Sequence, residues 1–386
     1  MSKILKAMII GTGGIAPIHI EGFLEFKDKV EIVAVAGFSS LSRAQKLVDD
    51  YKLNARATCD YKEFLDEVDI VAICTPPSSH MEIACTCLDK NINVLLEKPM
   101  APSLEECDLI LESARRSKAV LSVVSQSRFT TSIWKTIKLL HKGDYGKVLH
   151  TNVNSLWWRG KNYYDLAWRG RWDTEGGGCT LNHAVHHIDL LIWAKGLPVE
   201  VYSVMDNLAH GNSEVEDISI SILKFSDGSL GQITASLVNH GEKQNINFQM
   251  EKASLSIPFD LATSKQRGNG FPIEDEETKD KLLNDYKDLP DLEYELHTGQ
   301  IEEFINCIQK GEKPLVGGEN GRETIELITG IYKSACLKQS IKLPLSESDD
   351  FYSREGILRN VPRFNEKVNY IDSYDDKSIT TFKGKY

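Results

Sequence analysis

The feature that most constrains the fold of this chain is the regular alternation of short apolar segments with amphipathic ones in its first third. The apolar segments have the length and the Val/Ile/Leu content of strands buried on both faces. Strands are expected at 4–10, 30–36, 70–74, 94–96 and 120–124, and helices at 15–26, 42–51, 61–67, 79–90 and 103–117. This alternation predicts an α/β fold with a doubly wound parallel sheet, which we assign to residues 1–124.

After residue 125 the pattern changes to strand-like segments that follow one another with turn signals between them. The clearest signal is Asp227-Gly228, which is typical of a hairpin turn. We therefore expect a second α/β domain over 125–345, with a mostly antiparallel open sheet. The acidic stretch 274–291 is expected to be a solvated loop, with a cation site as the alternative. The polar, aromatic tail 346–386 is expected to pack on the body or on a neighbouring subunit.

Composition excludes several classes of partner. The net charge of −11 disfavours nucleic acid and anionic membrane surfaces, and no apolar run has the length of about 18 residues that a membrane span needs. The N-terminus enters a strand at once, which leaves no room for a signal peptide. The eight cysteines are scattered and form no CxxC pair. Reduced thiols in a cytoplasmic protein are therefore expected.

A glycine-rich turn follows the first strand and opens the first helix. Its sequence, Gly11-Thr12-Gly13-Gly14-Ile15-Ala16, matches the dinucleotide-binding pattern G-x-G-x-x-G/A. Gly11 permits the tight turn, Gly13 leaves room beside a pyrophosphate, and the helix N-terminus adds oriented N–H groups. We therefore predict a bound NAD or NADP, with Gly11, Gly13, Gly14 and Ile15 among its contacts.

The choice between NAD and NADP stays open. The second strand ends in Gly37-Phe38-Ser39-Ser40, without the carboxylate that usually binds the adenosine ribose of NAD. Ser39, Ser40 and Arg43 suit a 2′-phosphate, although Arg43 fits a plain helix-surface charge as well. The third strand ends in a Thr75-Pro76 turn leading to His80, which is expected to pass beside the nicotinamide half.

Lys98 follows the fourth expected strand, in the run Glu97-Lys98-Pro99. The carboxyl ends of parallel strands form the rim where doubly wound sheets bind ligands. Pro99 restricts the backbone of Lys98 to an extended conformation. The chain is thus expected to direct a cation at the ligand on this rim.

A second cluster of polar residues lies in the second domain. Gly176-Gly177-Gly178 precedes a segment, 181–193, with a helical pattern, and the glycines are expected to let a ligand approach its first turn. Asn182 and His186 then share one helix face, and a histidine there can exchange a proton near neutral pH. His183 and His187 are also four residues apart. They would need a third ligand to bind zinc, and no metal site is predicted.

Taken together, these motifs resemble the glucose-fructose oxidoreductase / inositol dehydrogenase / rhizopine-catabolism (Gfo/Idh/MocA) family. The matching pieces are GTGGIA at 11–16, TPPSSH at 75–80, EKP at 97–99, GGG at 176–178 and NHAVH at 182–186. The resemblance covers about residues 4–345. It implies a Rossmann domain followed by an α/β domain with an open sheet, through which a homodimer or homotetramer often forms.

The resemblance also implies roles for individual residues. Lys98 and His186 match the catalytic lysine and histidine, while Asn182 stands where the family commonly has Asp. The amide of Asn182 can form hydrogen bonds, but it cannot share the negative charge of an aspartate carboxylate with the histidine or the lysine. Glu97, Lys98 and Gln126 join the expected cofactor contacts. The expected substrate pocket is lined by Arg128, Trp157, Arg159, Tyr163, Tyr164, Trp168, Arg169, His183 and His297, with ordinary packing as the alternative for each.

The predicted function is NAD(P)-dependent oxidoreduction of a secondary alcohol on a sugar, sugar derivative or cyclitol. In the oxidative direction His186 takes the hydroxyl proton, Lys98 stabilises the developing alkoxide, and Asn182 orients substrate or His186. Two alternatives stay open. One is a glycoside-processing enzyme with tightly bound NAD, working through a transient keto-sugar. The other is a sensor that binds dinucleotide without turnover.

Overall fold

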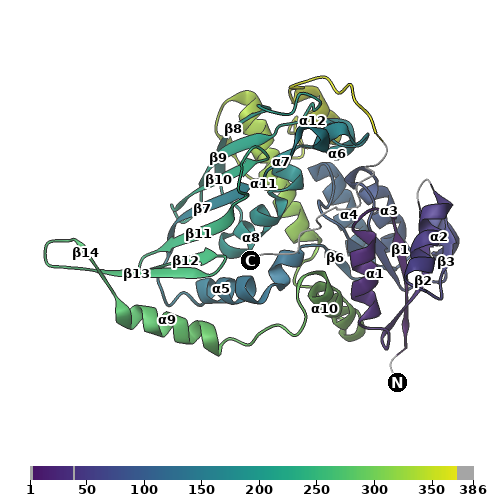
Figure 1. Ribbon diagram of the computed structural model, residues 1–386, viewed down its shortest axis with the longest axis horizontal. Helices are drawn as coiled ribbons and strands as arrows, with labels where there is room; N and C mark the ends of the chain where they lie inside the picture. The colour runs from purple at the N-terminus through teal and green to yellow at the C-terminus, as the bar shows by residue number, and fades with distance from the viewer. Residues whose placement is uncertain (1–2, 38–39, 372–386) are drawn as a thin grey trace.

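The computed structural model describes residues 3–37 and 40–371. A six-stranded parallel sheet with the order β3-β2-β1-β4-β5-β6 forms the first domain (Figure 1). This confirms the doubly wound fold. Its strands are β1 (Leu5–Ile10), β2 (Val30–Ala36), β3 (Arg56–Thr58), β4 (Ile70–Ile73), β5 (Asn93–Leu96) and β6 (Leu121–Val123), and its main helices α1 (Ala16–Leu24), α2 (Leu41–Asp50), α3 (His80–Asp89) and α4 (Leu104–Arg116).

Local chemistry explains where these helices begin. Ser103 caps α4, because its hydroxyl accepts a hydrogen bond from the Glu106 N–H at 3.3 Å. Ser40 caps α2 in the same way, through the N–H of Arg43. The helix expected at 61–67 is instead a single 3-10 turn, η1 (Tyr61–Phe64), because one turn suffices to bury both aromatic rings.

A nine-stranded sheet forms the second domain, in the order β14-β13-β12-β11-β7-β10-β9-β8-β15. Neighbouring strands are antiparallel except β7 and β10, so the sheet is mixed and mostly antiparallel, as expected. The hairpin at Asp227-Gly228 is confirmed. The strands are β7 (Val148–Leu156), β8 (Glu200–Asp206), β9 (Ile218–Lys224), β10 (Leu230–Ser236), β11 (Gln244–Met250), β12 (Ala253–Ile257), β13 (Asp260–Gln266), β14 (Pro272–Glu274) and β15 (Ile341–Lys342).

The acidic stretch 274–291 is mostly helical, and the expected loop is wrong. Helix α9 (Glu276–Asp288) begins at Asp275, whose carboxylate accepts from the Thr278 N–H. Leu282 is fully buried against α5 (Thr131–Lys142), and Tyr286 stacks on Phe259 at 3.7 Å. A few apolar contacts therefore hold a helix whose remaining surface is charged.

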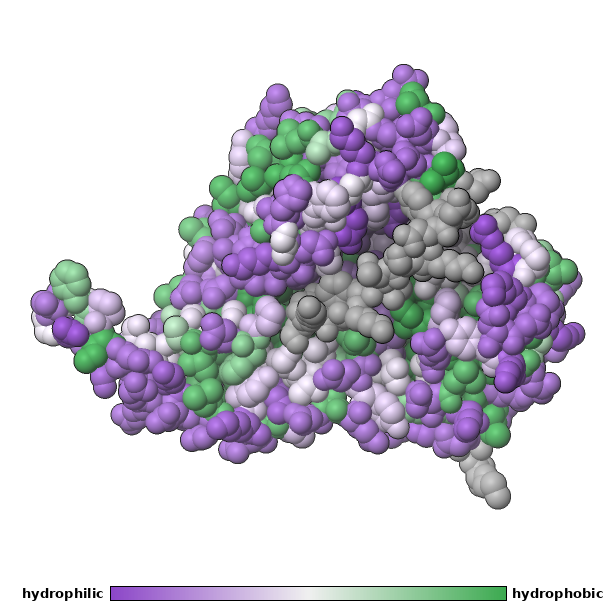
Figure 2. Space-filling model, in the orientation of Figure 1, coloured by the Kyte–Doolittle hydropathy of each residue, from purple (hydrophilic) through white to green (hydrophobic). Residues whose placement is uncertain are grey.

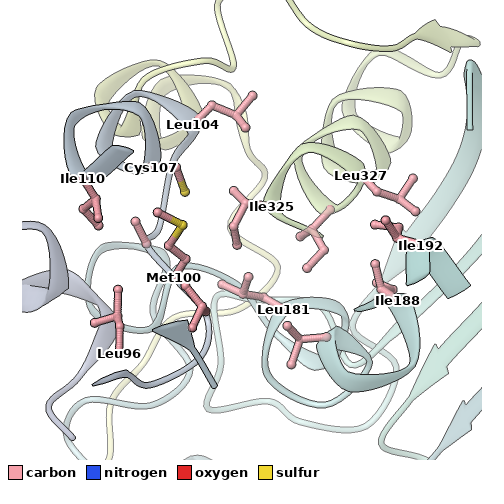
Figure 3. Close-up of a cluster of buried hydrophobic side chains, with 14 of the residues drawn as sticks. Leu96, Met100, Leu104, Cys107, Ile110, Leu181, Ile188, Ile192, Ile325 and Leu327 are labelled. Atoms are coloured by element: carbon pink, nitrogen blue, oxygen red, sulfur yellow. The ribbon is translucent and has the colours of Figure 1, made fainter. Parts of the chain in front are cut away.

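One hydrophobic core joins the two domains (Figure 3). Leu96 and Met100 from the end of β5 face Leu181 and Ile188 from the second domain, with Ile325 of α11 (Gly318–Leu337) between them. Helix α10 (Leu296–Lys310) returns to pack on α1 of the first domain. The two domains are thus fixed against each other at the end of β5.

Residues 346–371 lie on the body of the chain. Helix α12 (Arg354–Asn360) sits near α4, and the Pro362 carbonyl accepts from the Trp172 indole N–H at 2.8 Å. The Lys367 ammonium donates to the Tyr164 carbonyl. Within the described residues, no helix combines the length and apolarity that a membrane crossing requires.

Candidate active site

Lys98 lies where the two domains meet, directly after β5. The Lys98–Pro99 peptide is cis. His80 is fully buried under this turn, with Nδ1 3.0 Å from the Pro99 carbonyl and Nε2 2.9 Å from the Thr75 carbonyl. His80 therefore links the turn at Thr75 to the turn at Lys98. Its buried ring supports these two turns and is not open to a ligand.

Glu97 forms a buried ion pair beside Lys98. Its Oε1 lies 2.8 Å from Nε2 of His19 in α1 and 3.8 Å from Nε2 of His297 in α10. Burial alone would raise the pKa of Glu97, but the hydrogen bond and charge of His19 lower it to about 2. Burial likewise opposes the charge on His19, yet neighbouring Cys74 and Glu97 raise its pKa to about 10. His19 and Glu97 thus stay paired as ions across the neutral range.

The Lys98 ammonium has no ion-pair partner within the part of the chain that the structure describes. Burial, together with the charge of Arg169, lowers the pKa of Lys98, while Glu97 acts in the opposite direction. Lys98 and His186 border the same small pocket, together with Ser125 and Asp189. The two residues expected to carry the chemistry are therefore brought together.

The segment 181–193 is not one helix as expected. Helix α7 (Cys179–Asn182) ends, the chain turns at His183-Ala184, and α8 (Val185–Lys195) begins. The Asn182 amide donates to the Gly177 carbonyl at 2.7 Å and the Gly178 carbonyl at 3.3 Å. Asn182 thus holds the glycine loop, and the shared helix face with His186 is lost.

The three glycines also serve the packing of the protein itself. A Cβ on Gly177 would lie 2.1 Å from the Tyr332 hydroxyl, and one on Gly178 would lie 1.8 Å from the Glu216 carbonyl. Gly176 has a φ of +83°. Gly177 thus packs on α11 and Gly178 on Glu216, just before β9. The approach of a ligand to the first turn after these glycines stays a prediction.

The histidines of this segment are neutral at neutral pH. Burial lowers the pKa of His186 well below its ordinary value, and the Lys98 charge adds to the effect. Burial also lowers the pKa of His183 strongly, with help from Arg159 and Arg169, and that of His187 to about 4. A neutral His186 can accept a proton, as the oxidative direction requires.

Aromatic side chains and an arginine gather around His183. The Tyr163 hydroxyl lies 3.3 Å from His183 Nε2, and the Trp157 ring centroid lies 6.0 Å from that of His183. The Arg169 guanidinium sits 4.3 Å from the centroid of Tyr163 and 4.2 Å from that of Trp168. These residues, expected in the pocket, do form one cluster.

Arg128 and Tyr164 occupy different positions from this cluster. Arg128 is 1% exposed and binds Asp189 of α8 through both Nε (2.8 Å) and Nη2 (2.7 Å). Tyr164 is buried behind Tyr163, edge-on at 5.1 Å. His297 lies with His19 and Glu97, 13% exposed at the side chain. We propose that Arg128 positions α8 rather than contacting substrate.

The glycine turn fits a dinucleotide. Gly11 has a φ of +109° and passes so close to β4 that a Cβ would meet the Cys74 carbonyl at 2.5 Å. A Cβ on Gly13 would meet no atom within 4 Å, so this side is open. No side chain caps the N-terminus of α1. The Ala16 and Ile18 N–H groups donate to the Gly13 and Ile15 carbonyls at 3.1 Å, so the positive end of the helix dipole is what this terminus offers an anion.

Gln126 adds to this fit. Its Oε1 is buried without a hydrogen-bond partner among the described residues, so an amide or hydroxyl of a ligand would satisfy it. Arg43 is exposed at the start of α2, and Ser40 is committed to capping. Ser39 lies outside the described residues.

Among the described residues, the one group of three side chains spaced for a metal ion is His19, Glu97 and His297, with donor atoms within 4.8 Å of one another. Its shortest pair is already a hydrogen bond. His183 and His187 do not gather a third ligand in this part of the chain. Sequence reasoning missed His19, whose only signal was a histidine within the apolar face of the first helix.

Comparison with known proteins identifies the family of the chain. A profile described as "Oxidoreductase family, NAD-binding Rossmann fold" matches residues 5–125, and one described as "GFO/IDH/MocA C-terminal domain" matches residues 133–256. The chain belongs to the Gfo/Idh/MocA oxidoreductase family. Its first domain is therefore an NAD-binding Rossmann domain.

The similarity to individual members of the family covers nearly the whole chain. A myo-inositol 2-dehydrogenase from Thermotoga maritima is 24% identical over 88% of this chain and 98% of its own length. A D-glucoside 3-dehydrogenase from Escherichia coli is 24% identical over 86% and 96%. The fold is shared with a WlbA dehydrogenase in complex with NADH and UDP-GlcNAcA (TM-score 0.78, 23% identity, 90% and 98% covered) and a levoglucosan dehydrogenase in complex with NADH and levoglucosan (0.75, 18%, 89% and 100%).

Proposed function

We propose that this protein oxidises a secondary alcohol of a sugar, sugar derivative or cyclitol with NAD or NADP, or catalyses the reverse reduction. The observation that carries the proposal is the pairing of neutral His186 with unpaired Lys98 on one cavity at the carboxyl end of β5. Relatives of similar length are named as inositol and glucoside dehydrogenases, which supports this class of substrate.

Each residue of the site has its own role in the proposed reaction. Bound dinucleotide, held by the Gly11–Ile15 turn and Gln126, would supply the acceptor for the hydride. His186 takes the hydroxyl proton, because burial and the Lys98 charge keep the imidazole neutral. Lys98 donates a hydrogen bond to the same oxygen and stabilises the developing alkoxide. The Glu97–His19 pair fixes the turn that carries Lys98.

A panel of polyols, aldoses and glycosides, assayed with NAD and with NADP, tests this proposal. We expect reduction of the nicotinamide with at least one member. We also expect NADP to be accepted, because residues 37–45 contain no carboxylate to repel a 2′-phosphate. Tight dinucleotide binding without turnover across the panel would contradict the proposal and favour a sensor.

A second candidate, cofactor recycling through a transient keto-sugar, has support from one relative. A protein named 2,7-anhydro-N-acetylneuraminate hydratase, from Mediterraneibacter gnavus, is 22% identical over 66% of this chain and 67% of its own length. The same panel separates the two candidates, because recycling releases product without net reduction of the nicotinamide.

We further infer that the chain self-associates through the outer face of its large sheet. Strand β9 places Ile220 and Ile222 outward, 47% and 58% exposed, and Ser219 and Ser221 inward. This inverts the usual pattern, in which the apolar side chains face the core. Figure 2 shows apolar side chains gathered over β8–β10, where Val204 and Leu230 are also about half exposed.

A homodimer or homotetramer is the expected outcome, since exposed patches of this kind mark interfaces. Sedimentation velocity measures the mass directly. Ile222→Glu should shift the mass toward the monomer, whereas Lys224→Glu, at the end of the same strand face, should shift it much less. A monomeric wild type at micromolar concentration would contradict this inference.

A further inference from the structure

The surroundings of His183 concentrate positive charge in a protein that is acidic overall. The chain carries a net charge of −11, yet Lys98, Arg159 and Arg169 all act on His183 electrostatically. They come from separate segments, the end of β5 and the loops after β7. The fold therefore brings the Lys98 ammonium close to two guanidinium groups that lie much later in the sequence.

The two guanidinium groups share one aromatic ring. Arg169 lies 4.3 Å from the centroid of Tyr163, and Arg159 lies 5.7 Å from the same centroid. Arg159 also lies 5.5 Å from the centroid of Trp157. The aromatic faces thus hold both cations beside His183. Nη1 of Arg159 already donates to the Trp158 carbonyl at 2.6 Å, so a ligand would bind the other N–H groups of this guanidinium.

The carboxylates nearby neutralise this charge only in part. Glu175, 1% exposed, accepts from Arg169 at 2.9 Å and also from the Gly170 N–H. Glu242 binds Arg159 at 2.6 Å but is 44% exposed. Arg169 Nε is buried without a partner among the described residues. Glu97 also acts on Lys98, but it is paired with His19. With that pair included, three carboxylates face four cations.

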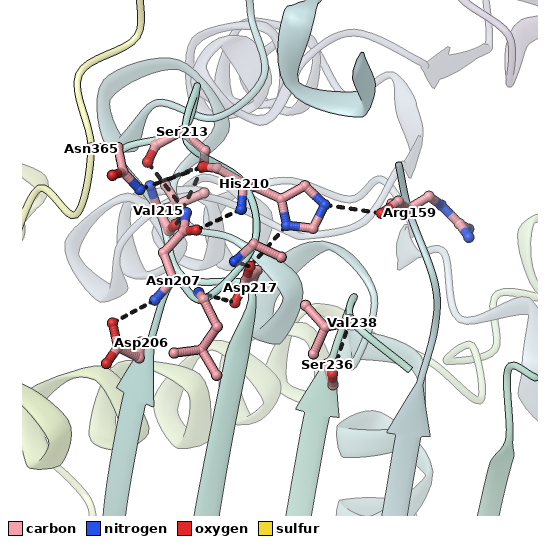
Figure 4. A network of polar contacts seen from close by, with 12 residues as sticks. Arg159, Asp206, Asn207, His210, Ser213, Val215, Asp217, Ser236, Val238 and Asn365 are labelled. Carbon is pink, nitrogen blue, oxygen red and sulfur yellow. Dashed lines mark hydrogen bonds and ion pairs between the residues drawn. The ribbon is translucent and has the colours of Figure 1, made fainter. Parts of the chain in front are cut away.

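Hydrogen bonds hold the backbone of Arg159 in place (Figure 4). Its carbonyl lies 3.0 Å from Nε2 of His210, whose Nδ1 lies 2.8 Å from the buried carboxylate of Asp217. Its N–H donates to the Leu237 carbonyl at 2.9 Å. The side chain extends away from this network. Arg159 is therefore an anchored cation near His183 rather than a free surface side chain.

We propose that the substrate is an anionic sugar, whose carboxylate or phosphate binds Arg159 and Arg169 while its secondary alcohol lies between Lys98 and His186. This inference rests on the proposed function and narrows its substrate class. Guanidinium groups bind both anions through paired charge-assisted hydrogen bonds. A neutral sugar would leave the excess positive charge uncompensated.

Matched pairs of sugars test the proposal. Glucuronate against glucose isolates the carboxylate, and glucose 6-phosphate against glucose isolates the phosphate. We expect kcat/KM for at least one anionic member to exceed that for glucose by roughly 10- to 100-fold, and this advantage to shrink as salt concentration rises.

Substitutions of single arginines test which side chain causes the preference for the anionic sugar. Arg159→Gln should reduce the anionic-to-neutral ratio about 10-fold or more, and Arg159→Lys should restore part of it. Arg171→Gln removes the same charge from a side chain paired with Asp173, and should leave the ratio as it is. Equal ratios in wild type and Arg159→Gln would overturn the proposal.

Calorimetry keeps this test separate from the proposed function. If no sugar is turned over, binding of each pair to the enzyme with NADH still reports the preference. Tighter binding of the anion that Arg159→Gln abolishes would support the anion site even where the proposed oxidation fails. Turnover of neutral sugars at equal efficiency would reject the anion site and leave the oxidation standing.

Discussion

Lys98→Met and His186→Ala are each expected to lower kcat by about 10²–10⁴-fold, the usual contribution of a positioned acid or base. Lys98 supplies the only unpaired ammonium that borders the cavity within the described residues, and His186 the neutral imidazole opposite it. Neither side chain forms a hydrogen bond that holds the fold within the described residues. Steady-state kinetics with the best substrate of the panel measures the loss.

The matched controls are Lys118→Met and His150→Ala, which remove the same groups at exposed positions far from the cavity. Both should turn over like the wild type. NADH binding, followed by fluorescence, should persist in all four variants, because the glycine turn is untouched. Near-normal turnover in either Lys98→Met or His186→Ala would show that the assigned residue is not required.

Arg128→Ala is expected to destabilise the protein by about 3–5 kcal/mol, as is typical when one partner of a buried ion pair is removed. Both members are nearly fully buried, at 1% and 7% side-chain exposure, and their contact is bidentate. Without Arg128, the Asp189 carboxylate stays buried with only the Ser125 hydroxyl as a donor. Urea unfolding followed by circular dichroism measures the change.

The double variant Arg128→Met/Asp189→Leu provides the control. It removes both charges, so it should lose less stability than Arg128→Ala alone. A second control, Arg115→Ala, breaks an exposed pair with Glu319 and should cost at most about 1 kcal/mol. A loss below about 1 kcal/mol for Arg128→Ala would mean that this pair does not anchor α8.

Much of the first domain, and the meeting of Lys98 with His186 at one pocket, could be predicted from the sequence. Buried parallel strands are continuous apolar runs, and the glycine turn has a fixed spacing, so both signals are local. Lys98 could be placed because it directly follows such a strand. The pattern of neighbouring motifs then indicated His186.

Contacts between distant segments could not be predicted in this way. Asn182 bonds the carbonyls of its own glycine loop, and Gly177 packs on Tyr332, 155 positions further along the chain. Helix α9 depends on one buried leucine and a stacked ring, which a largely charged segment does not reveal. Arg128 looked like a pocket cation because its partner, Asp189, lies in another segment.

The most direct test of the central claim is to follow hydrogen from substrate to cofactor. A sugar deuterated at the oxidised carbon is incubated with the enzyme and NAD, and the reduced nicotinamide is isolated for mass spectrometry. The proposed hydride transfer predicts that the nicotinamide carries the deuterium and that His186→Ala suppresses the labelling. Sugar turnover that leaves the nicotinamide unlabelled throughout would contradict it.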